Sequence, residues 1–183
     1  MTKLKKYKMF INGEWTDSES KKTFQTLNPE NNEPWAEVPE ASEKDVDKAV
    51  KAAQKAFEGT WSKLFPKERA KYLKAIAEQL RENAEHLGKI ETIDTGKLFK
   101  ETKTQANYIA EYYDYYAGLA DKVEGTVLPI DKANMQVITT RVPIGVVAAI
   151  IPWNSQMLLT AVKLAPALAM GNTVPSTLSA KPA

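Results

Sequence analysis

An uninterrupted apolar run, Ile144 to Ile151, constrains the fold of this chain more than any other segment. The run has the length of a strand, and its lack of alternation is typical of a strand that is buried on both faces of a parallel sheet. The run ends in Pro152-Trp153-Asn154 instead of small turn residues. The segment from Ser155 to Met170 is predicted to form a helix. Open α/β sheets place ligand-binding and catalytic groups at the carboxyl ends of their strands. We therefore expect a functional site beside Asn154.

The segments on either side of this run predict an α/β fold. Helices are expected after Ser42, from Pro66 to Gly88 and from Phe99 to Leu119, because apolar residues recur there at helical spacing and Ser42 and Pro66 are favoured at helix starts. Strands are expected in the segments 9–15, 26–39, 123–142 and 172–174, the first with a turn at Asn12-Gly13 and the last broken at Pro175. Helices followed by a strand–helix–strand unit indicate an α/β domain with an incomplete Rossmann-like parallel sheet.

Composition excludes several classes of protein. The 183 residues suffice for one domain, and a net charge of +2 is too small to indicate nucleic-acid binding. There is no cysteine, and the single His86 excludes most multi-histidine metal sites. The amino terminus has no apolar signal core, and the long apolar stretch 142–162 is interrupted by prolines and polar residues. We expect a cytoplasmic protein that neither spans a membrane nor binds nucleic acid.

Two longer segments carry a family resemblance. They are Arg141-Val-Pro-Ile-Gly-Val-Val-Ala-Ala-Ile-Ile-Pro-Trp-Asn154 and Lys163-Leu-Ala-Pro-Ala-Leu-Ala-Met-Gly-Asn-Thr-Val174. Together they resemble the aldehyde dehydrogenase superfamily, whose members are NAD(P)-dependent. The resemblance implies the amino-terminal portion of such an enzyme: residues 1–124 and 143–183 would belong to the NAD(P)-binding domain, residues 125–142 would form an oligomerisation arm, and the catalytic domain would be absent.

Asn154 is the principal candidate residue. By position alone it could cap the helix that begins at Ser155, or its amide could donate to an oxygen on which negative charge develops. The resemblance implies the second role, on the aldehyde oxygen. It also implies that Ile150, Ile151, Pro152 and Trp153 line the cofactor cleft. Lys181 would bond the adenosine ribose in one alignment, whereas an alignment on Pro175-Ser176 has no such lysine. NAD and NADP both stay open, and no Gly-x-Gly-x-x-Gly fingerprint supports either.

A second candidate site surrounds Asp94, in the motif Glu91-Thr-Ile-Asp-Thr-Gly-Lys97. An Asp before Thr-Gly most often serves a turn. The resemblance implies, for some members, a cation between the Asp94 carboxylate and the backbone of Thr26-Leu27, and oxygen ligands suit such ions. The helical stripe Tyr108, Tyr112 and Tyr115/Tyr116 is expected to be core.

Because the sequence has no cysteine, two interpretations of its function stay open. The mechanism that the resemblance implies needs a cysteine thiolate to attack the aldehyde and a glutamate to activate water. We therefore expect this chain alone to be inactive, although the family oxidises small aldehydes to carboxylic acids and complete members are homo-oligomers. The alternative is a non-catalytic chain that acts as a binding or oligomerisation module through residues 125–142.

Overall fold

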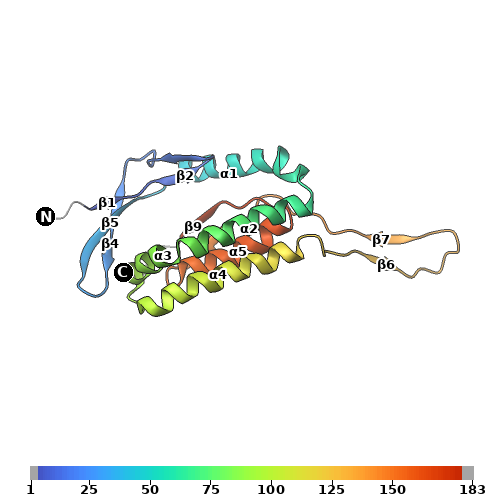
Figure 1. Ribbon diagram of the computed structural model, residues 1–183. Coiled ribbons are helices and arrows are strands. Elements are labelled where there is room, and N and C mark those ends of the chain that lie inside the picture. Colours follow the sequence, from blue (N-terminus) through green and yellow to red (C-terminus); the bar gives the residue numbers. More distant parts are fainter. Residues whose placement is uncertain (1–3, 179–183) are drawn as a thin grey trace.

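The computed structural model describes residues 4–178. Five α-helices and short strands make up this part of the chain (Figure 1). The elements are β1 (Lys5–Lys6), β2 (Met9–Ile11), β3 (Glu14–Thr16), β4 (Thr23–Asn28), β5 (Glu33–Pro39), α1 (Glu43–Glu58), the 3-10 turn η1 (Trp61–Lys63), α2 (Pro66–Glu82), α3 (Ala84–Thr95), α4 (Phe99–Leu119), β6 (Thr126–Leu128), β7 (Val137–Thr139), β8 (Ala149–Ile151), α5 (Gln156–Ala169) and β9 (Ser176–Leu178). The expected α/β class is confirmed.

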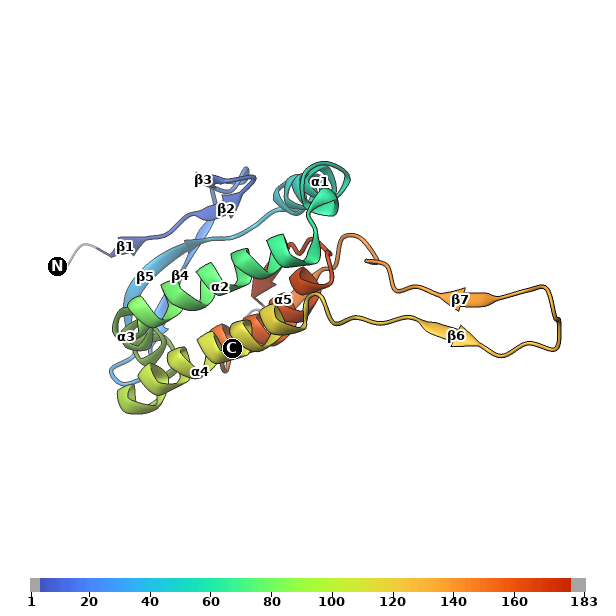
Figure 2. The ribbon, with the colours of Figure 1, turned by 45° about the vertical axis from the view of Figure 1, so that its right-hand side comes forward.

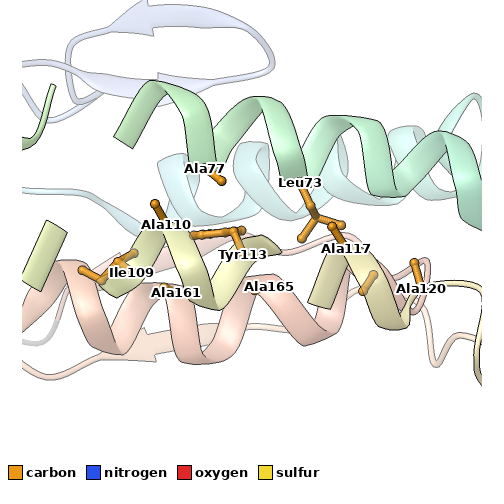
Figure 3. Close-up of a cluster of buried hydrophobic side chains, with 10 residues drawn as sticks. Leu73, Ala77, Ile109, Ala110, Tyr113, Ala117, Ala120, Ala161 and Ala165 are labelled. Atoms are coloured by element: carbon orange, nitrogen blue, oxygen red, sulfur yellow. The ribbon is translucent and has the colours of Figure 1, made fainter. Parts of the chain in front are cut away.

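Helices α2, α4 and α5 form the core of the molecule. Ala77 of α2 lies over Ala110 and Tyr113 of α4, and Leu73 of α2 points towards Ala117 of α4 (Figure 3). Alanines dominate the buried positions of α4 and α5, and their small side chains allow the helix axes to approach closely. Removing a fully buried leucine or isoleucine side chain from water stabilises such a core by about 1.5–3 kcal/mol. The expected tyrosine stripe is confirmed for Tyr112 and Tyr116, which pack against this core, but it is wrong for Tyr108 and Tyr115, which are exposed, and it left out the buried Tyr113.

The predicted helix from Pro66 to Gly88 is in fact two helices. The chain breaks at Asn83, which ends α2 and precedes α3. Gly88 lies inside α3, where a Cβ would come within 2.9 Å of the Lys103 backbone of α4. That glycine therefore permits a close helix contact and does not end a helix. The end of α3 falls at Gly96, whose φ of +78° is the left-handed conformation favoured for glycine.

The strand–helix–strand unit β8–α5–β9 is present, with β8 and β9 parallel. The expectation that the run 144–151 is buried on both faces is wrong: Ile151 is 1% exposed, whereas Ile150 is 66% exposed. The face that carries Ile151 packs towards the helices. The opposite face, which carries Ile150, is left largely uncovered by the described residues. Pro175 also disturbs the sheet less than expected. It cannot donate to the ladder, but its carbonyl accepts from Ala149 N at 3.0 Å, and pairing resumes in the same register at Ser176.

Two pairs of short strands flank the helices. The β2–β3 hairpin has Asn12 and Gly13 at positive φ, as predicted for an Asn-Gly turn. The antiparallel pair β6–β7 projects away from the body, and the β1-β5-β4 sheet lies at the opposite end (Figures 1 and 2). Helix α1 lies beside β2, and two of the apolar residues that recur along it at helical spacing, Val46 and Val50, are exposed. Among residues 4–178, no helix is long and apolar enough to span a bilayer.

Candidate functional site

Asn154 lies in the turn between β8 and α5, at the carboxyl end of a parallel strand. Its side chain is exposed and makes no hydrogen bond to any other described residue. The N-cap position of α5 belongs to Ser155, and no side-chain cap bond forms there. The capping role considered for Asn154 is therefore not found. The amide is left with its donors open to solvent at the strand end, the position where α/β sheets present groups to ligands.

The four residues before Asn154 do not all face the same way. Ile150 is 66% exposed and Trp153 is 40% exposed, and Pro152 is exposed too. The Ile151 side chain is buried on the helix side of the sheet, so Ile151 could meet a molecule bound beside Asn154 only through its backbone. Lys181 lies outside the described residues. The segment thus offers an apolar surface next to a free amide.

The hydroxyl of Ser155 contacts the ammonium of Lys97, in the loop that follows α3. Lys97 Nζ also donates to Glu91 Oε1 at 3.2 Å. The Glu91 side chain is 3% exposed, and its second oxygen, Oε2, is buried with no hydrogen-bond partner. A buried carboxylate is costly unless it is paired, so Glu91 depends on Lys97. The start of α5 is thereby connected to the interior of the molecule.

A second connection runs through Asp94. Gln156, the first residue of α5, donates from Nε2 to Asp94 Oδ2 at 2.8 Å, and Thr26 donates from Oγ1 to Asp94 Oδ1 at 2.6 Å. The structure therefore brings Thr26 and Asp94 together, as the cation hypothesis requires, and Leu27 follows at an irregularity of the β4–β5 pairing. No cluster of three or more His, Cys, Asp or Glu side chains that could hold a metal occurs within residues 4–178. A site made of one carboxylate and backbone oxygens stays a prediction.

Two surface hollows of about 410 and 400 Å³ do not include Asn154 in their lining. The first is lined by the lysine-rich strands near the amino terminus. The second lies under β8 and β9 between the helices and is largely apolar, with Tyr113 and Ile151 in its lining. Burial raises the pKa of Tyr113 to about 12, so this phenol is neutral near pH 7. Neither hollow gathers an acid–base pair with Asn154, and the candidate site is therefore the turn itself.

Comparison with known proteins agrees with this geometry. Residues 15–181 match the model of the aldehyde dehydrogenase family. The chain belongs to the aldehyde dehydrogenase family. It is 48% identical over 172 residues to (Z)-2-((N-methylformamido)methylene)-5-hydroxybutyrolactone dehydrogenase of Acinetobacter baylyi, a match that covers 93% of this chain and 35% of that aldehyde dehydrogenase relative.

Solved structures give the same result for the fold. Betaine aldehyde dehydrogenase of Staphylococcus aureus, crystallised with NAD+, superposes with a TM-score of 0.89 at 37% identity, covering 94% of this chain and 35% of that one. The 3,6-anhydro-L-galactose dehydrogenase in complex with NADP superposes with a TM-score of 0.90 at 29% identity, covering 97% of this chain and 37% of that one. The chain spans about a third of the length of these aldehyde dehydrogenase family members.

Three residues of the site escaped the sequence analysis: Glu91 as a buried anion, Lys97 as its partner, and Gln156 as a donor to Asp94. The motif Glu91 to Lys97 was noticeable, and its i, i+3 spacing puts Glu91 and Asp94 on one helix face. Ser155, the partner of Lys97, and Gln156, the partner of Asp94, lie about sixty residues further along the chain. Only the tertiary structure of the aldehyde dehydrogenase fold brings them together.

Proposed function

We propose that this protein takes part in the oxidation of an aldehyde to a carboxylic acid with NAD+ or NADP+ as the hydride acceptor. Asn154 would serve as the oxyanion donor: its Nδ2 would donate to the aldehyde oxygen as negative charge builds up on it. The observation that carries the proposal is the Asn154 amide itself, which is exposed at the carboxyl end of β8 and is not used as a helix cap. The attacking thiolate would lie outside these residues, because the sequence has no cysteine.

The residues beside Asn154 fit a nicotinamide cofactor in part. Ile150 and Trp153 offer exposed apolar surface to a planar ring or a ribose, and the start of α5 is a helix N-terminus that favours negative charge. When bound, the nicotinamide would supply the hydride acceptor. The two cofactor-bound structures named above support this assignment, since one holds NAD+ and the other NADP. Lys181 stays a proposed ribose contact.

A chimeric enzyme tests the role of Asn154. Residues 15–178 of this chain would replace the matching segment of the Staphylococcus aureus betaine aldehyde dehydrogenase, and NAD+-dependent oxidation of betaine aldehyde would be measured. Asn154→Ala should lower kcat by about 10²–10³, the loss typical of one oxyanion donor, with little change in NAD+ affinity. Asn107→Ala is the matched control, because Asn107 is an exposed asparagine on α4. An active chimera in which both variants turn over equally fast would contradict the assignment.

The β6–β7 hairpin favours a second function, self-association. We infer that residues 125–142 pair with a copy of this chain in a homo-oligomer. The hairpin stands clear of the body (Figure 2), and Val127, Met135 and Ile138 are each more than half exposed along it. Unpaired edge strands with exposed apolar side chains readily add another strand. This role requires no catalysis and would suit a chain without cysteine.

Sedimentation of the purified chain tests that inference. Ile138→Lys should convert an oligomer to monomer, because it places a charge where two hairpins would meet. Val46→Lys is the matched control: Val46 is similarly exposed, but on α1. A monomeric unmodified chain, or equal loss of the oligomer in both variants, would overturn the inferred role of the hairpin.

A further inference from the structure

Asn154 is not tethered itself, but it precedes two residues that are. Its own side chain makes no hydrogen bond within residues 4–178, and it lies on the exposed side of the turn. The next two residues are both tethered by side chains, Ser155 to Lys97 and Gln156 to Asp94. Both tethers end in the segment 91–97 at the carboxyl end of α3. The backbone on the carboxyl side of Asn154 is therefore linked to that segment.

Lys97 occupies an unusual position for a cation. Its ammonium contacts the N-cap residue of α5, at the helix end that carries partial positive charge and favours anions. A lysine stays there only if an anion compensates, and Glu91 supplies it at 3.2 Å from a position that is 4% exposed. Glu91 in turn requires a cation because a buried carboxylate without one is costly. The two charges hold each other in place, and they anchor Ser155, the N-cap residue of α5.

The backbone that carries Lys97 is itself fixed. Gly96 ends α3 at φ +78°, and a Cβ at this position would come within 2.9 Å of Pro29 Cγ. Thr95 donates from Oγ1 to the Glu91 carbonyl oxygen at 2.6 Å and also accepts from Lys97 N at 3.4 Å. The loop is thus packed against the β4–β5 turn and tied back to the last turn of the helix. Lys97 has little freedom to follow Ser155 if the start of α5 moves.

We propose that the Glu91–Lys97 ion pair is a positioning device for Asn154: it anchors Ser155 and so holds the adjacent amide in one direction at the carboxyl end of β8. Neither Glu91 nor Lys97 is a catalytic residue in this scheme. The proposal rests on the proposed function in one respect only, namely the use that the enzyme would make of the positioned side-chain amide of Asn154. The anchoring itself is a property of the folded chain without cofactor or aldehyde.

Nuclear magnetic resonance of the ¹⁵N-labelled chain, without cofactor or substrate, tests the proposal. In the unmodified chain the backbone amide of Asn154 should have an order parameter near the rigid value of about 0.85. Ser155→Ala keeps the ion pair and the buried charges balanced but removes the anchored hydroxyl, so the order parameter at Asn154 should fall below about 0.6. Ser155→Thr keeps a hydroxyl and should restore the rigid value. The Asn154 side-chain amide resonances should shift in the alanine variant and return in the threonine variant.

The controls lie on α3 and α4. Thr104→Ala removes a hydroxyl near the start of α4, where Thr104 Oγ1 donates to the Lys100 carbonyl oxygen at 2.8 Å, and it should leave the Asn154 signals unchanged. Lys97→Met should mobilise Asn154, whereas Lys89→Met, which removes an exposed ion pair of α3 with Glu85, should not. The double variant Ser155→Ala/Lys97→Met should lower the order parameter no further than Lys97→Met alone.

Two outcomes would overturn the proposal. One is a backbone amide of Asn154 whose order parameter is as high in Ser155→Ala as in Thr104→Ala. The other is a loss of order in Ser155→Ala that Ser155→Thr does not restore, which would indicate general damage to the turn. If Lys97→Met does not fold, the serine variants still decide the question. Failure of the proposed function is a separate result, because it would appear in the chimera as unchanged turnover of Asn154→Ala while these resonances still moved.

Discussion

Gln156 Nε2 and Asp94 Oδ2 lie 2.8 Å apart although 62 residues separate them in sequence. The bond joins the first turn of α5 to the end of α3, beside the turn that carries Asn154. Because a hydrogen bond to a charged group contributes about 1.5–3 kcal/mol, Gln156→Ala should lower the free energy of unfolding by an amount in that range. Urea denaturation followed by circular dichroism measures the change.

The control for Gln156 is Gln79, which donates to Glu82 at 2.7 Å on the exposed side of α2. Exposed pairs of this kind contribute about 0.2–0.5 kcal/mol, so Gln79→Ala should shift the urea midpoint far less. Equal shifts in the two variants would mean that the α5–α3 bond adds no more than a surface contact.

Two descriptions of the Asp94 site can be told apart by experiment: a carboxylate that only accepts hydrogen bonds, and a carboxylate that also binds a cation. The two carboxylate oxygens of Asp94 accept from Thr26 and Gln156 at 2.6 and 2.8 Å, and no second carboxylate joins them among the described residues. We therefore expect the melting temperature in potassium chloride to equal that in choline chloride at the same ionic strength. A rise in potassium that disappears in Asp94→Asn would instead establish the cation beside Thr26 and Leu27.

The sequence predicted those elements whose signals are local. The Asn12-Gly13 hairpin and the helix from Phe99 to Leu119 follow from turn chemistry and periodicity, and the structure has both. Gly88 shows where that reasoning fails. A glycine after an apolar stripe indicates a helix end, but here it admits the backbone of α4, and that neighbour is unknown until the fold is known.

The candidate site shows the same division. Asn154 is a candidate because it follows an apolar strand and precedes a helix, and its donor role is what the resemblance to the aldehyde dehydrogenase superfamily implies. The ion pair that anchors the next residue was missed, because Lys97 meets Ser155 only after α3, α4 and the hairpin have folded back. The one-sided burial of β8 was missed for a related reason: an apolar sequence does not tell how many of its faces this part of the chain will cover.

Asn172 binds the backbone of the segment that precedes β8. Its Oδ1 accepts from Ile144 N at 2.8 Å and from Gly145 N at 3.1 Å, and its Nδ2 donates to the Ala167 carbonyl oxygen at 3.1 Å. Asn172 is 7% exposed, and Gly145 is buried. Asn172→Ala leaves the Gly145 amide without its acceptor, so the free energy of unfolding should fall by about 1–3 kcal/mol.

Asn107→Ala provides the comparison for Asn172, since Asn107 is exposed and, among residues 4–178, its side chain makes one hydrogen bond, at 3.5 Å to the carbonyl oxygen of Lys103 in its own helix. The change at Asn107 should stay within about 0.5 kcal/mol, as surface substitutions do. A small effect at Asn172 as well would show that strand pairing alone holds the segment that precedes β8.

Asp45 is a buried carboxylate near the start of α1. It accepts from Ser42 N at 2.8 Å, from the Ser42 and Ser18 hydroxyls at 2.7 and 2.9 Å, and from Glu19 N at 3.1 Å. The backbone bond from Ser42, together with these other donors, holds the pKa of Asp45 far below its usual range, although burial acts in the opposite direction. The folded protein therefore keeps this side chain ionised in acid.

This depressed pKa predicts a pH dependence of stability. Unfolded Asp45 takes up a proton near pH 3.9, whereas the folded form does not, so the contribution of Asp45 is complete well above that pH and is lost as the pH falls below it. Asp45→Asn should be less stable than the unmodified chain at pH 7, and the two urea midpoints should converge between about pH 4 and pH 2. Asp17→Asn, at an exposed carboxylate 3.8 Å from Lys8, should run parallel to the unmodified chain. If instead the Asp45→Asn curve stays parallel and Asp17→Asn converges, the donors around Asp45 do not favour its charged form.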